Sequence, residues 1–176
     1  MVDQSRVLDF AAIGMRWEIT RSTADTGGAF FEAINVVAPG FGGPPLHLHP
    51  HAEETYAVTA GALDVCVAGD WRTLRAGESV TVPAGIAHTL KNPHAEEVAL
   101  INVHKPALDI ERFFLRMHAL VCAGKLTLPP KNLRSMILIS MLFVEHRQEI
   151  VSVKPPEGVM RAMALVGRVC GFRLPG

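Results

Sequence analysis

In the first hundred or so residues, short apolar stretches alternate with turns rich in Gly and Pro. This pattern constrains the fold more than any other feature of the sequence. Turn clusters at residues 25–28, 39–45 and 83–85 are typical of the boundaries between the stretches. The predicted strands cover residues 15–20, 30–37, 46–49, 54–59, 62–68, 71–74, 79–82, 88–91 and 98–104. Many short strands at a spacing of roughly 8–12 residues indicate an all-β sandwich or barrel.

The pattern changes to a helical one after Pro106. Apolar residues recur at helical spacing from Ile110, with Asp109 as a predicted N-cap and Gly124 as a stop. Further helices are predicted over residues 132–146 and 157–170, with proline pairs between the helices. The sequence therefore predicts a β-barrel in residues 1–106. A helical extension in residues 107–176 would pack on the barrel or on a dimer partner.

Composition excludes several classes of protein. Seventeen basic and seventeen acidic residues give a formal net charge of zero, which argues against a globally basic nucleic-acid binder. The charged first ten residues do not resemble a signal peptide, and the longest apolar-rich run is about half a membrane span. Three widely spaced cysteines suit neither a disulfide framework nor a cysteine zinc site. We expect a cytoplasmic protein with no nucleic-acid or membrane partner.

Four residues predict a metal site. His47 and His49 lie two positions apart on a predicted strand, so their side chains point to one face. Two imidazoles inside a barrel are costly unless something binds their nitrogens, and a metal ion does so. Glu54 opens the next strand and can supply a carboxylate oxygen, while His88 begins a separate strand and can complete the set.

The spacing of the first group resembles the first motif of the cupin superfamily, in the form His47-x-His49-x4-Glu54-x6-Gly61. That motif has a glycine six positions before its first histidine. Phe41 stands there in this chain, among glycines at 40, 42 and 43, so the loop that enters the strand is shifted in register.

A second stretch resembles the second cupin motif at every signature position, in the form Gly77-x5-Pro83-x-Gly85-x2-His88-x3-Asn92. The resemblance covers roughly residues 12–105. It implies a jelly-roll barrel, the double-stranded β-helix, with a 3-His/1-Glu site inside. Such a donor set suits one divalent transition metal, namely Fe, Mn, Ni, Cu, Co or Zn.

Several assignments near the site stay open. Glu53 would be the ligand if the turn were one residue shorter, but strand parity favours Glu54. Tyr56 either lines the pocket or packs in the core. Asn102 and His104 share a face of the last strand, interpreted as facing solvent, with a cavity-facing position as the alternative. The remaining histidines are interpreted as loop, surface or tail residues without a role: His51, His94, His118 and His146.

The resemblance implies a metal-dependent oxygenase of the quercetin dioxygenase-like type, acting on a small organic substrate with Glu54 as general base. Two alternatives stay open: a redox-neutral isomerase, decarboxylase or cyclase-type cupin, and a non-enzymatic module that binds or senses a small ligand. A cupin-type transcription regulator is disfavoured because no helix-turn-helix is evident before residue 12.

The second predicted helix is apolar on nearly every side across residues 136–144, with only Ser140 interrupting. Such a helix must be buried on several sides, but one small barrel can cover only one side of it. Either the three helices form a layer of their own, or they close an apolar interface with a second copy. We expect a homodimer.

Overall fold

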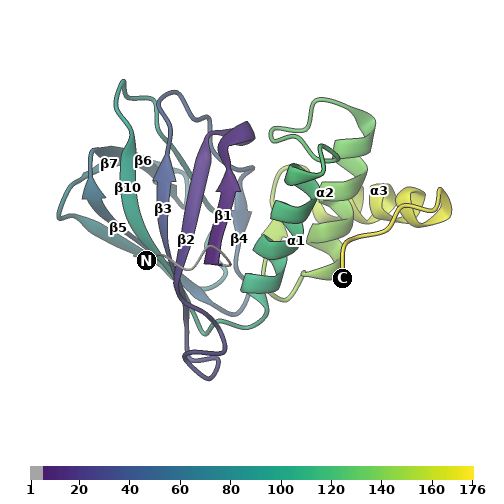
Figure 1. The fold of residues 1–176 in the computed structure, drawn as a ribbon, viewed down its shortest axis with the longest axis horizontal. Helices are drawn as coiled ribbons and strands as arrows, with labels where there is room; N and C mark the ends of the chain where they lie inside the picture. The colour runs from purple at the N-terminus through teal and green to yellow at the C-terminus, as the bar shows by residue number, and fades with distance from the viewer. Residues whose placement is uncertain (1–5) are drawn as a thin grey trace.

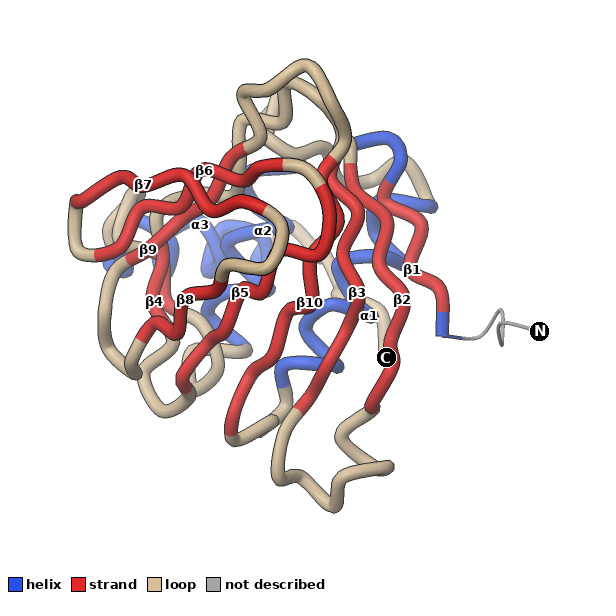
Figure 2. The backbone as a smooth tube through the Cα atoms, turned by 90° about the vertical axis from the view of Figure 1, so that its left-hand side faces the viewer, coloured by secondary structure: helices blue, strands red, loops and turns tan. Residues whose placement is uncertain are grey.

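In the computed structural model, which describes residues 6–176, two β-sheets face each other and three α-helices follow (Figure 1). The six-stranded sheet has the order β1-β2-β3-β10-β5-β8 and the five-stranded sheet the order β11-β4-β9-β6-β7. Figure 2 shows β1, β2, β3 and β10 side by side in the first sheet and β7, β6 and β9 in the second. The strands are β1 (Val7–Phe10), β2 (Met15–Arg21), β3 (Phe31–Val37), β4 (His47–Leu48), β5 (Glu53–Ala60), β6 (Ala62–Val67), β7 (Asp70–Arg75), β8 (Ser79–Val82), β9 (His88–Lys91), β10 (Val98–Lys105) and β11 (Val151–Ser152).

The predicted strands agree with these bounds to within about a residue at each end. The predicted strands do not include β1 and β11. The latter has two residues and lies within the helical extension, where it pairs with β4. A short helical turn, η2 (Ala11–Ile13), joins β1 to β2.

Strict alternation along the strands decides which side chains face the interior between the sheets. Along β10, residues 98, 100, 102 and 104 are buried, while the residues between them are partly exposed. The antiparallel register with β3 and β5 sets these positions beside the buried positions of those strands. Each inward row of the six-stranded sheet is therefore built from several strands.

The helices are α1 (Ile110–Cys122), α2 (Leu133–Glu145) and α3 (Glu157–Val169), close to the predicted ranges. The side chain of Asn132 caps α2 by accepting a hydrogen bond from the backbone N–H of Ser135 at 2.9 Å. Asp109 precedes α1, but its side chain makes no capping bond. The first helix begins there without the capping interaction expected from the sequence.

The burial of α2 explains its apolar circumference. One side packs in the core that α1 shares with β1 and β2, through residues such as Leu138 and Leu142. The other side faces α3, where Gly167 lets the helices approach: a Cβ there would lie 2.5 Å from Ile137 Cγ2. Figure 1 shows α1 next to the sheets and α3 farthest from them. Within residues 6–176, no helix is long and apolar enough to cross a bilayer.

Candidate metal centre and its cavity

The structure brings His47, His49, Glu54 and His88 together in the interior. One potential ligand atom from each of these residues lies within 4.8 Å of the others, and all four side chains are buried. His47 on β4 stands directly opposite His88 on β9, and Glu54 lies near the start of β5. Glu53, its sequence neighbour, is only half-buried and outside the group. The cluster could therefore hold a metal ion.

A backbone carbonyl holds the Nδ1 atom of each histidine. The bonds run from His47, His49 and His88 to the carbonyl oxygens of Pro45 (2.8 Å), Glu149 (2.5 Å) and Ile86 (2.8 Å). An imidazole that donates its Nδ1–H in this way keeps the Nε2 lone pair for a metal ion and has a fixed ring orientation. The arrangement of the three rings thus fits a transition-metal site.

The carboxylate of Glu54 has two distinct environments. Its Oε2 atom lies 3.0 Å from His49 Nε2 and 2.7 Å from His88 Nε2. Its Oε1 atom accepts a hydrogen bond from Asn102 Nδ2 at 2.7 Å and lies 3.3 Å from His104 Nε2. One oxygen therefore faces the candidate ligands while the other is held from the side of β10.

Ionisation also favours a cation at this place. Burial raises the pKa of Glu54, but the nearby His104 and His49 outweigh it and hold the pKa well below its usual range. Burial lowers the pKa of His47 to about 3, so that its ring is neutral. Burial lowers the pKa of His88 as well, yet the hydrogen bond to Glu54 raises it overall. The donor set thus contains an ionised carboxylate, and a bound metal would displace the proton that His88 shares with it.

Asn102 and His104 point inward, so the interpretation of these residues as facing solvent is wrong. Both are buried, and burial lowers the pKa of His104 to about 3. Neither ring nitrogen of His104 has a hydrogen-bond partner within the described residues. The alternation that begins with buried Val98 and Leu100 was the signal that could have placed them.

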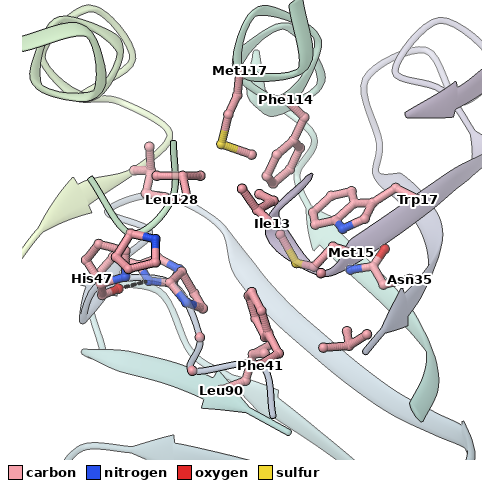
Figure 3. A pocket seen from close by; sticks show the side chains of 18 of the residues that line it. Ile13, Met15, Trp17, Asn35, Phe41, His47, Leu90, Phe114, Met117 and Leu128 are labelled. Atoms are coloured by element: carbon pink, nitrogen blue, oxygen red, sulfur yellow. Dashed lines mark hydrogen bonds between the residues drawn. The ribbon is translucent and has the colours of Figure 1, made fainter. Parts of the chain in front are cut away.

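A cavity of about 620 Å³ opens onto the cluster (Figure 3). His47, His49 and Glu54 line it at the cluster, together with Tyr56. Burial raises the pKa of Tyr56 well above its usual value, and Glu54 adds to this effect, so the phenol keeps its proton. Tyr56 is therefore both a core residue and part of the lining.

The helical extension closes part of this cavity. Figure 3 shows Phe114 and Met117 reaching into it from α1, with Leu128 above His47. The position where the first motif departs from its pattern also contributes, since the ring of Phe41 lines the cavity. Residues outside the two motifs thus shape most of the walls.

The other four histidines lie outside the cluster. His51 contacts Gln148, His94 contacts Asp64, and His118 contacts Cys122. His146 is buried, and its Nε2 atom lies 3.3 Å from Arg116 Nη1.

Comparison with known proteins agrees with this architecture. Residues 33–104 match the family model of the Cupin domain. The chain is 35% identical over 81 residues to mannose-1-phosphate guanylyltransferase of Escherichia coli (strain K12), and 33% identical over 81 residues to that of Salmonella typhimurium. Each match covers 44% of this chain, but only 17% of the relative's length.

Two solved structures have the same fold. An RmlC-like cupin from Shewanella frigidimarina is 21% identical, with a TM-score of 0.52 over 61% of this chain and 89% of that one. KdgF from Halomonas sp. is 18% identical, with a TM-score of 0.51 over 60% of this chain and 89% of that one. The predicted fold class, a mainly β jelly roll followed by helices, is confirmed. The family match, the two motifs and the fold together identify residues 33–104 as a cupin domain.

Proposed function

We propose that the protein is a metal-dependent oxygenase that acts on a small organic substrate. The carrying observation is the cavity of about 620 Å³ that ends on a buried cluster of three histidines and a glutamate. Enclosed cavities of this size with few convergent polar groups are typical of small-molecule sites. His47, His49, Glu54 and His88 would hold one divalent transition metal.

The residues fit such an ion because imidazole nitrogens with one carboxylate suit Fe, Mn, Ni, Cu, Co and Zn better than Ca or Mg. A redox-active metal, when bound, would supply Lewis-acid and one-electron chemistry toward O2 and an enol or phenol substrate.

The protein's own part in the reaction is proton transfer and the exclusion of water. Glu54 is the only carboxylate among the described residues that line the cavity, and its low pKa keeps it ionised. We assign it the role of general base that takes the proton of a substrate enol or phenol. Aromatic side chains such as Phe113 and Phe114 keep water away from this step.

Metal analysis of protein purified without added metal, followed by O2 electrode measurements with enol and catechol substrates, tests the proposal. Iron, copper, nickel or manganese near one per chain with O2 uptake is the expected result. His49→Ala should lose most of the metal while remaining folded. Glu54→Gln should lose O2 uptake more than it loses metal. Full metal content in His49→Ala would overturn the assigned site.

A redox-neutral cyclase, isomerase or decarboxylase is the second candidate. The apolar lining favours it, because such walls can fold a flexible apolar substrate without water. Zinc alone, with turnover of an enol substrate and no O2 uptake, would support this candidate. Tight ligand binding without any product would instead indicate a binding module.

A further inference from the structure

Apart from the two ring nitrogens of His104 beside Glu54, two buried polar atoms in the cavity wall have no partner within the described residues: Trp17 Nε1 and Asn35 Oδ1. The two side chains are only 6% and 4% exposed. Buried donors and acceptors are nearly always paired, because an unpaired one costs about 1–3 kcal/mol. A donor and an acceptor that both lack a partner in the same wall indicate that a bound molecule supplies their hydrogen bonds.

The two residues are direct neighbours across the antiparallel pair of β2 and β3. Figure 3 shows them together on one side of the cavity, with His47 on the other side. Leu100 of β10 pairs with Asn35, and His104 of the same strand pairs with Glu54. Along β10, the position beside Asn35 and the position beside Glu54 are four residues apart, which at ~3.3 Å per residue is about 13 Å. The cavity thus has two polar ends.

The rest of the wall is mainly apolar. Met15, Phe41 and Phe114 line it, and none of the described lining residues is Lys or Arg. A carboxylate or phosphate bound far from the metal cluster would lose its hydration without a counter-charge. The wall therefore fits an uncharged ligand with rings, about as long as the distance between the two polar ends.

We propose that Trp17 and Asn35 form a subsite for a hydroxyl group at the end of the ligand remote from the metal cluster. The indole N–H donates a hydrogen bond to the ligand oxygen, and the amide oxygen accepts the hydroxyl proton. One hydroxyl satisfies both open atoms at once. The inference rests on the proposed function only in assigning the other end of the ligand to the metal cluster.

A set of biphenyl probes of similar size tests the subsite by equilibrium dialysis, with metal-loaded and with EDTA-treated full-length protein. 4-Hydroxybiphenyl should bind about 10-fold more tightly than 4-methylbiphenyl in both, since a hydrogen bond to buried groups is made or lost. Biphenyl-4-carboxylate should bind at least about 100-fold more weakly than 4-hydroxybiphenyl to the EDTA-treated protein. Equal binding of the hydroxyl and methyl probes to the wild-type protein would overturn the proposal, and so would tight binding of the carboxylate there.

Two variants locate the preference. Trp17→Phe and Asn35→Leu keep the apolar bulk, and each should bring the ratio of the two affinities close to one. Met15→Leu, in the same wall, is the matched control and should leave the ratio unchanged. Asn35→Leu should also raise the thermal unfolding midpoint, because it removes an unpaired buried amide. A ratio that survives in both polar variants would overturn the subsite.

The dialysis result separates this inference from the proposed reaction. A hydroxyl preference without O2 uptake would support the subsite and count against the oxygenase. O2 uptake without a hydroxyl preference would support the oxygenase and overturn the subsite.

Discussion

Glu54 shows how much of the site depends on a single side chain. Its two oxygens contact different groups: His49 and His88 on one side, Asn102 and His104 on the other. A carboxylate held at one oxygen offers the other in a defined orientation, and such outer contacts tune metal affinity. We therefore expect Asn102, which donates a hydrogen bond to Glu54, and the nearby His104 to act as positioning residues for it.

Asn102→Leu removes the donor at 2.7 Å from Glu54 Oε1, so we expect metal affinity to fall about 10- to 100-fold. Competition with a chromophoric chelator measures this. Asn35→Leu makes the same chemical change on β3, at a residue that does not hydrogen-bond to Glu54, and should keep wild-type metal affinity. Equal affinities in the two variants would rule out the positioning role.

Acid should destabilise the metal-free protein. The pKa values of His47 and His104 are about 3 in the folded state, chiefly through burial, and return to about 6.5 on unfolding. The unfolded chain then binds more protons between these values, so the free energy of unfolding falls with falling pH, by up to about 1.4 kcal/mol per pH unit per imidazole. His88 has a raised pKa and opposes this: its stabilisation is complete below about pH 6.5 and is lost as pH rises through its folded pKa.

Urea unfolding of EDTA-treated protein at about pH 7 and about pH 5 measures the effect. His104→Phe should lose less stability between the two conditions than the wild type. His94→Ala removes a half-exposed histidine and should behave like the wild type. The same loss in His104→Phe as in the wild type would contradict the assignment.

At the scale of elements, the helical extension takes part in the candidate metal centre. Its strand β11 pairs with β4, placing Ser152 opposite His47. The carbonyl of Glu149, just before that strand, accepts the Nδ1–H of His49 from 100 residues further along the chain. The extension therefore orients candidate metal ligands that the two motifs supply.

Val153→Pro tests this support. The backbone N–H of Val153 donates to the carbonyl of Leu46 at 2.9 Å, and proline cannot make that bond. Loosening the β4–β11 pairing should lower metal affinity about 10-fold, although no ligand is changed. Val153→Ala keeps the N–H and is the control. Chelator competition on both variants would contradict the role if they bound metal equally.

For the whole molecule, α2 needs no second copy to cover it, because α1 and α3 enclose it within one chain. Four of the exposed large apolar side chains lie on α3, where Leu165 is 60% exposed and Val169 is 80% exposed. These residues carry the expectation of a homodimer, since exposed apolar surface favours association.

Analytical ultracentrifugation at micromolar concentration tests the dimer. The wild type should sediment as a dimer, and Leu165→Glu with Val169→Glu should shift it to a monomer because two charges would be buried in an apolar interface. Leu133→Glu, an equally exposed site on α2, should stay dimeric. A monomeric wild-type protein would end the dimer hypothesis.

The local sequence was enough to predict most strands and helices and to select His47, His49, Glu54 and His88. Strand parity, turn residues and helix periodicity act over a few residues, so one sequence displays them directly. The spacings of the two motifs also related residues on different strands, across the turns between them. The predictions were wrong about Asn102 and His104 because polar side chains were taken to face solvent, although their alternation with Val98 and Leu100 places them on the buried face.

Tertiary structure alone decided the contacts between distant segments. The register of β2 against β3 makes Trp17 and Asn35 neighbours, and the return of the tail brings the Glu149 carbonyl to His49. Neither residue pair has a local signature, because a cross-strand register depends on how all the sheet's strands pack. A backbone carbonyl has the same chemistry in every residue, so only the folded chain reveals which one holds the imidazole.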